Sequence, residues 1–188
     1  MVLVFSDNRN LNIELLSKGS ELAKELGEKL TTIIIGKSDE ELANEYISFG
    51  AEEVYIAENE IEFFKSEEFS DIIEKIINET NNNYILIGSN KNGKELASRL
   101  AGKIDAGCII DCSNIYFKDK KITAERTVYS GNAISIEQFN SLPAILTVSS
   151  KVFDPLKKDE NHEFTPIIQQ IINSNHHTLC FLHNPMKI

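Results

Sequence analysis

Gly88, Gly93 and Lys94 stand at the spacing of a phosphate-binding loop. The segment 84–102 reads YILIGSNKNGKELASRLAG, and it matches G-x-x-x-x-G-K-[ST] at every position except the last. In such loops, backbone N–H groups and a lysine hold phosphate oxygens, while a hydroxyl at the last position binds magnesium. That position is Glu95 here, and its carboxylate would repel a triphosphate. The motif therefore does not indicate an NTPase.

The same letters are typical of a helix start. Asn92 is a favoured N-cap residue, and Glu95, three positions later, can return a hydrogen bond as in a capping box. The apolar residues that follow recur at helical spacing, at Leu96, Ala97, Leu100, Ala101 and Ile104. The sequence thus predicts a helix whose apolar face packs on a sheet.

A ligand crevice is nevertheless expected beside this loop. The loop follows the carboxyl end of a predicted strand, where open α/β sheets bind ligands, especially where the strand order reverses. If the order resembles that of flavodoxin, the crevice lies between the ends of the first and fourth strands. We predict a cofactor-binding crevice formed by Ser6, Asp7, Gly88, Ser89, Gly93 and Lys94.

The elements around the crevice follow from the apolar pattern. Short β-branched runs alternate with segments of helical period, which is typical of βαβ units around a parallel sheet. We expect strands at 2–6, 30–35, 53–57 and 84–87. Helices are expected from about Asn12 to Leu26 with a stop at Gly27, from a Ser38–Glu41 capping box to Phe49, and over 69–80.

From Cys108 the pattern changes, because no long helical segment interrupts the next forty residues. KDKK and YSGN read as polar turns between strands, and Pro143 introduces a last apolar strand at 144–148. The predicted fold class is α/β, with a Rossmann-like parallel sheet flanked by helices and an antiparallel β-hairpin extension. We expect one domain over 1–154 and a tail over 155–188 that holds a linker and a short apolar segment.

The bulk composition excludes several partners. The formal net charge is −10, from 19 basic and 29 acidic residues, which disfavours nucleic acid as a partner. No apolar run approaches membrane-spanning length and no leader precedes the first strand, so we expect no membrane insertion and a cytoplasmic location.

The cysteines and histidines do not predict a metal or redox site. His176, His177, Cys180 and His183 are ligand types for zinc, but their spacing matches no zinc finger. Cys108 and Cys112 lie four residues apart in a predicted strand, so they should share a face yet remain distant, as buried free thiols. No Ser/His/Asp or Cys/His triad can be assembled from the spacing of these residues, so we expect no hydrolytic catalysis.

The YSGN turn offers polar groups for recognition. Arg126, Tyr129, Gly131 and Asn132 could bind a partner through a guanidinium, a phenol and an amide at a hairpin tip. Alternatively, Gly131 and Asn132 supply the positive backbone angles of a tight turn, and Arg126 is a solvated strand residue. Both interpretations stay open at this point.

Four segments carry a family resemblance. They are FGAEEVYIAE (49–58), GSNKNGKELASRLAGKID (88–105), ERTVYSGNAIS (125–135) and LPAILTVSSKVFDP (142–155). In this order they resemble the N-terminal domain of electron transfer flavoprotein α subunits, over residues 1 to about 155. The resemblance implies the adenine-nucleotide α-hydrolase-like fold. Lys94 stands where the family usually has arginine, and Ser98 where it has proline.

The resemblance also implies a function. Family α subunits continue into a second domain whose GGRG, GQTG and GiSGA-qH motifs hold most of the FAD, and none of these motifs occurs in this sequence. The expected role is a partner-binding domain of a flavin-dependent electron transfer assembly, without its own complete FAD site. Its partner would be a β-like subunit or a second copy in a self-associated dimer. FAD is the cofactor implied by the family, with AMP as a further candidate. The alternative is a nucleotide-binding module of the universal-stress-protein kind that binds AMP or ATP in the crevice.

Overall fold

The computed structural model describes residues 1–58, 63–119, 121–155 and 167–172. Its strands are β1 (Val2–Phe5), β2 (Leu30–Gly36), β3 (Glu53–Glu58), β4 (Tyr84–Gly88), β5 (Gly107–Lys118), β6 (Lys121–Val128), β7 (Ala133–Gln138), β8 (Ala144–Val148) and β9 (Ile167–Ile172). Its α-helices are α1 (Arg9–Leu26), α2 (Glu40–Ser48), α3 (Ser66–Thr80) and α4 (Lys91–Lys103). Within the described residues, the strands form one sheet in the order β7-β6-β5-β8-β4-β1-β2-β3-β9.

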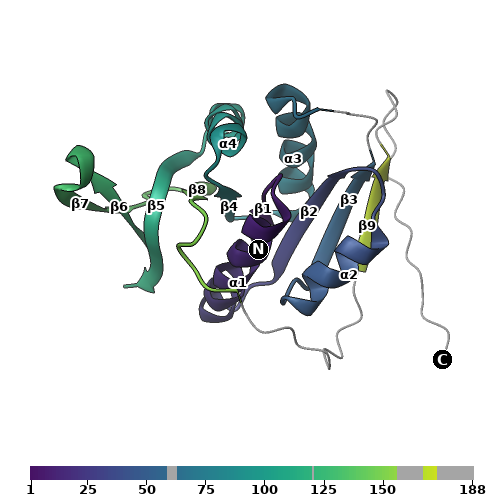
Figure 1. Cartoon of the computed structure of the whole chain (residues 1–188), viewed down its shortest axis with the longest axis horizontal. Coiled ribbons are helices and arrows are strands. Elements are labelled where there is room, and N and C mark those ends of the chain that lie inside the picture. The colour runs from purple at the N-terminus through teal and green to yellow at the C-terminus, as the bar shows by residue number, and fades with distance from the viewer. Residues whose placement is uncertain (59–62, 120, 156–166, 173–188) are drawn as a thin grey trace.

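The predicted Rossmann-like class with an antiparallel extension is confirmed. Strands β1, β2, β3, β4 and β8 pair in parallel, whereas β5, β6 and β7 form an antiparallel meander that projects from one side of the body (Figure 1). β5 joins the two parts, because it pairs in parallel with β8 and antiparallel with β6.

Helices cover both faces of the parallel part. One core cluster joins α1 and α2 to Val2, Val4 and Leu86, and a second joins α3 and α4 to Leu3 and Ile85 (Figure 1). Alternate residues of one strand therefore enter opposite cores. Burial on both faces explains why these strands are continuous apolar runs.

The helix starts differ from those that the sequence predicts. Asn8 caps α1 by accepting a hydrogen bond from the backbone N–H of Leu11 at 3.0 Å, so this helix begins at Arg9 and not near Asn12. The predicted Ser38–Glu41 capping box is wrong, because the Asp39 carboxylate accepts from the N–H of Leu42 at 2.8 Å. α3 begins at Ser66, before the predicted start. The predicted stop of α1 at Gly27, with φ of 66°, is confirmed.

The start of α4 is also corrected. Asn90, not Asn92, is the N-cap, and its Oδ1 accepts from the N–H of Gly93 at 2.7 Å. Glu95 does not return a capping hydrogen bond, because its carboxylate accepts from the hydroxyl of Ser66 at the start of α3. Glu95 thus links α4 to α3, which lie on the same face of the sheet.

A bulge in β5 changes the predicted position of the cysteines. The pairing with β8 advances three residues, from Ile109 to Cys112, while β8 advances two, and Asp111 has a φ of 57°. The extra residue reverses the side-chain alternation. Cys108 therefore packs on the α3/α4 core and Cys112 lies in the α1/α2 core, so the expectation of a shared face is wrong. Burial raises the pKa of the Cys112 thiol to about 12.

Part of the predicted tail forms a strand. β9 pairs in parallel with β3, from Glu53 opposite Ile167 to Glu58 opposite Ile172, and it extends the sheet beyond β3. His176, His177, Cys180 and His183, whose side chains are of metal-ligating types, lie outside the described residues.

Candidate ligand crevice and partner surface

The strand order reverses between β1 and β4. The chain proceeds from β1 to β2 and β3 on one side, whereas β4 and β8 lie on the other. Phe5 pairs with Ile87, so Ser6 and Asp7 after β1 adjoin Gly88 and Ser89 at the end of β4. The structure thus brings the sequence-predicted residues together at the expected switch point.

Close packing explains both glycines of the loop motif. A Cβ atom on Gly88 would lie 2.5 Å from Oγ of Ser6 and 2.6 Å from Cδ2 of Leu11. A Cβ atom on Gly93 would lie 1.7 Å from the carbonyl oxygen of Gly88. The turn from β4 into α4 is therefore too tight for a side chain at position 93, and a side chain at position 88 would displace those of Ser6 and Leu11. The motif spacing thus has a structural cause that does not involve phosphate.

The carboxylate of Asp7 lies where the N-termini of two helices meet. It directly precedes Asn8, the cap of α1, and its Oδ1 accepts from the side-chain amide of Asn90, the cap of α4. Its Oδ2 accepts from the side-chain amide of Asn92 at 2.8 Å. Helix N-termini carry partial positive charge and attract anions. An anion supplied by the chain itself already holds this position.

Lys94 is also engaged within the protein. Its Nζ donates to Oδ2 of Asp111 at 2.7 Å, and the hydroxyl of Ser89 donates to Oδ1 of Asp111 at 2.6 Å. The backbone N–H of Asp111 donates to Oγ1 of Thr147 at 2.9 Å, which ties the β5 bulge to β8. Burial acts to raise the pKa of the Asp111 carboxyl, but the hydrogen bonds from Lys94 and Ser89 outweigh it and hold that pKa below its ordinary value.

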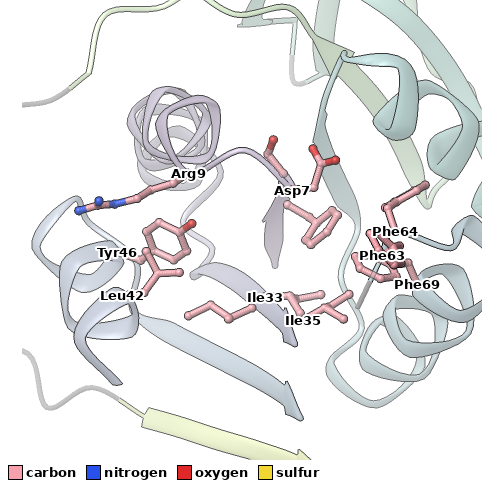
Figure 2. Close-up of a pocket in the computed structure, with 12 residues that line it drawn as sticks. Asp7, Arg9, Ile33, Ile35, Leu42, Tyr46, Phe63, Phe64 and Phe69 are labelled. Atoms are coloured by element: carbon pink, nitrogen blue, oxygen red, sulfur yellow. The ribbon is translucent and has the colours of Figure 1, made fainter. Parts of the chain in front are cut away.

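A cavity of about 390 Å³ opens beside Asp7. Figure 2 shows Ile33 and Ile35 of β2 on one side, the phenylalanines on a second side, and Leu42 and Tyr46 of α2 on a third. Its described lining comprises Phe5, Ser6, Asp7, Arg9, Ile33, Ile34, Ile35, Leu42, Tyr46, Phe63, Phe64 and Phe69. Ser6 and Asp7 are the predicted site residues in this lining, whereas Gly88, Ser89, Gly93 and Lys94 lie outside it.

The charges around the cavity do not favour phosphate. Arg9 is the one cation among the described lining residues, and its Nε and Nη2 donate to the two carboxylate oxygens of Glu45, each at 2.6 Å. The hydrogen bond and the charge of Glu45 raise the pKa of Arg9. Burial raises the pKa of the Tyr46 phenol to about 12, so it stays neutral. The pyrophosphate of FAD does not fit this set of residues, because Asp7 would oppose it and Arg9 is already paired.

The second predicted group lies at the tip of the β6–β7 hairpin. Tyr129 and Ser130 adopt positive φ of 50° and 53° beside Gly131 at 95°. Asn132 does not supply a positive φ, since its φ is −87°; instead its side chain donates to the carbonyl oxygen of Tyr129 at 2.9 Å. Nε of Arg126 lies 3.6 Å from Oε1 of Glu137 on β7, so Arg126 joins two strands.

In addition to the predicted Tyr129, the hairpin exposes two isoleucines that the sequence did not single out. The side chains of Tyr129, Ile134 and Ile136 are 81%, 64% and 65% exposed. Ile134 and Ile136 stand two apart on β7, so they share a face of the edge strand. Alternation of apolar and polar residues over 134–137 was the available signal, but it does not indicate which face of the strand stays uncovered.

The crevice residues that sequence reasoning missed come from distant segments. The sequence favours Asn92 over Asn90 as the cap of α4, and it indicates Asp111 only as one residue of a strand. Thr147 reaches the site through the pairing of β8 with β4. Phe63 lines the cavity although it is 77% exposed, and no motif around it in the sequence predicts this position.

The fold defines a Rossmann-like α/β protein with a cavity beside its topological switch point. The family model for the electron transfer flavoprotein domain matches residues 2–171. The chain belongs to the electron transfer flavoprotein family. This confirms the resemblance that the four sequence segments indicated.

Curated relatives agree with this assignment. The chain is 30% identical over 164 residues to an electron transfer flavoprotein subunit alpha of Clostridium acetobutylicum, covering 82% of this chain and 49% of that protein. It is 26% identical over 179 residues to the putative electron transfer flavoprotein subunit YdiR of Escherichia coli, covering 95% and 55%. It is 28% identical over 146 residues to subunit LctC of the lactate dehydrogenase (NAD(+),ferredoxin) of Acetobacterium woodii, covering 76% and 35%. The chain spans about half the length of the alpha-type relatives it matches.

Among the described residues, no helix is both long and apolar enough to cross a membrane.

Proposed function

We propose that this domain docks a partner subunit in a flavin-dependent electron transfer assembly, through the hairpin formed by β6 and β7. The observation that carries this proposal is the exposed apolar face of the hairpin, with Tyr129, Ile134 and Ile136. The partner is a β-like electron transfer flavoprotein subunit, with a second copy of this chain as the other candidate.

The hairpin has the properties of a docking element. Fully burying each large apolar side chain contributes about 1.5–3 kcal/mol, so three exposed ones on one projection supply substantial binding energy. β7 also ends the sheet, and its outer edge offers backbone N–H and C=O groups for pairing. The ion pair of Arg126 and Glu137 lies on the other face of the hairpin, because Glu137 alternates with Ile134 and Ile136 along β7. The exposed apolar face is thus free of this charge, and depletion of charged residues is typical of the centre of a protein interface.

The flavin is held outside the crevice in this proposal. The switch point carries the Asp7 carboxylate, and the nearby cations Arg9 and Lys94 are paired to Glu45 and Asp111. Because both of these cations are already paired, they offer a dinucleotide pyrophosphate little to bind. The same charges disfavour the alternative function, a module that binds AMP or ATP.

The test compares two variants in a binding assay. A β-like subunit from the same organism is loaded with flavin and titrated with the wild-type chain by isothermal titration calorimetry. The double variant Ile134→Lys/Ile136→Lys should weaken binding by about 100-fold or more, because the charges would be desolvated in the interface. Both residues are exposed, so the melting temperature of the free chain should change little.

A matched control removes an exposed apolar side chain far from the hairpin. Phe63→Ser changes a residue that lines the cavity beside β1 and β2, and it should leave partner binding intact. Equal affinity of the hairpin variant and the wild type would rule out docking through this face. Sedimentation of the chain alone, with and without the hairpin substitutions, separates a self-associated dimer from a heterologous complex.

A spectrum tests the flavin part of the proposal. The isolated chain should show no stoichiometric flavin absorbance, whereas the complex with the β-like subunit should be yellow. Stoichiometric flavin bound by the isolated chain would contradict the view that FAD lies outside this domain.

A further inference from the structure

The cavity beside Asp7 has apolar walls and a polar end at Asp7, and Arg9, paired with Glu45 of α2, also lines it. Ile33 and Ile35 of β2 and the ring of Phe5 form its base, with Ile33 and Phe5 almost fully buried. Phe64 and Phe69 pack against each other with ring centroids 4.8 Å apart, and Phe5 packs edge-on against Phe69 at 6.0 Å. These rings are held in place by one another, so this wall is preformed (Figure 2).

Phe63 extends the aromatic wall toward solvent. Its side chain is 77% exposed although it lines the cavity, so a planar ligand would cover a ring that water now contacts. Leu42 and Tyr46 of α2 face it from the other side (Figure 2). Small-molecule sites are typically about 300–1,000 Å³, mostly apolar, with a few placed polar groups, and this cavity has both properties.

The polar end selects hydrogen-bond donors. Each oxygen of Asp7 accepts one amide hydrogen bond, from Asn90 or Asn92, and a carboxylate oxygen can accept a further one. The side chain is also solvent-exposed, so a ligand can reach it. In dinucleotide-binding sheets an acidic side chain accepts from ribose hydroxyls in the same way. Hydroxyl or amine groups therefore suit this end, whereas a phosphate meets a carboxylate.

We propose that this cavity binds a planar aromatic molecule with hydroxyl or amine donors and no phosphate, of which a nucleoside is the representative. The ring lies between the phenylalanine wall and the α2 wall, and the donors reach Asp7. The carboxylate of Asp7 occupies the place at the two helix N-termini where a nucleotide would put its phosphate. This inference does not depend on partner docking, because β5, β8 and β4 separate the β6–β7 hairpin from β1 and β2, which line the cavity.

The test uses adenosine and AMP as probes on the full chain. Binding is followed by the amide resonances of residues 5–7 and 33–35 in two-dimensional NMR titrations. Adenosine should bind saturably, and AMP should bind about tenfold more weakly, because its phosphate approaches Asp7. Asp7→Asn should remove this preference, so that AMP binds at least as well as adenosine.

Two further variants establish whether adenosine binds in this cavity. Phe63→Ser should weaken adenosine binding by about tenfold, since stacking on an exposed ring is lost while the fold is retained. Ile134→Lys/Ile136→Lys should leave adenosine binding unchanged, and loss of partner binding in that variant is scored separately. Absence of saturable adenosine binding, or tighter binding of AMP than adenosine by the wild type, would overturn the proposal.

Discussion

Lys94 donates a hydrogen bond from Nζ to Oδ2 of Asp111 across 2.7 Å, and this contact joins the first turn of α4 to the bulge of β5. The two residues are separated by 17 positions in the chain and meet because β5 and the end of β4 both flank β8. The lysine that completes a phosphate-loop spacing thus neutralises a carboxylate of the same molecule.

The Asp111 carboxyl should make stability depend on pH in acid. Its pKa is lowered in the folded state, so its contribution is present above the unfolded value of about 3.9 and is lost as pH falls through the lower folded value. Asp111→Asn should reduce the free energy of unfolding at pH 7 by up to about 1 kcal/mol, since both partners are partly exposed. The difference from wild type should shrink toward pH 3 in urea titrations.

A matched control for this prediction is Asp105→Asn. Asp105 is exposed and, like Asp111, has a positive φ, which is 51°. Asp105→Asn therefore removes a carboxylate from a residue with a similar backbone conformation. Its effect should stay within about 0.5 kcal/mol. A pH-independent effect of Asp111→Asn would show that the ion pair with Lys94 does not contribute.

Gly93→Ala should be strongly destabilising. The added methyl would lie 1.7 Å from the carbonyl oxygen of Gly88, and backbone on both sides must move to relieve the overlap. We expect a loss of about 3 kcal/mol or more in thermal or urea unfolding. Gly102→Ala, in the same helix, has no neighbouring atom within 4 Å and should stabilise by about 0.5–1 kcal/mol. Similar results for the two variants would show that close packing does not require glycine at position 93.

Comparing Asn90→Ala with Asn92→Ala should show which of the two asparagines caps α4. Asn90 caps the helix and also donates to Asp7, so its replacement should cost about 1 kcal/mol or slightly more. Asn92 contributes only its contact with Asp7 and lies inside the helix, where alanine is favoured, so we expect a change below about 0.5 kcal/mol. Urea unfolding measures both values. A larger loss of stability for Asn92→Ala than for Asn90→Ala would show that Asn92 is the cap, as the sequence predicted.

The sequence predicted the parallel strands and the hairpins well for a physical reason. Strands buried on both faces must be apolar throughout, and tight turns require residues such as Gly131, so both leave local signals. Helix starts were less certain because several residues near each start can act as caps. Asn90 and Asn92 are chemically identical, and the path of the turn after Gly88 decides which one caps.

The candidate sites were predicted less completely. Ser6, Asp7, Gly88 and Ser89 could be placed together, because the ends of adjacent parallel strands share an edge. Their partners could not, since Asp111 reaches Lys94 through a bulge that one extra residue creates. The same bulge moved Cys112 to the face opposite Cys108.

By itself, the sequence determined the family, the α/β class and the meeting of the ends of β1 and β4, because these depend on apolar periodicity and on short motifs of neighbouring residues. Only the tertiary structure decided what the crevice holds and which surface stays uncovered. Asp7 meets Asn90 and Asn92 after more than eighty residues of chain, and Arg9 meets Glu45 after 36. Such pairings set the charge at the helix N-termini, and they arise from the order of the strands in the sheet.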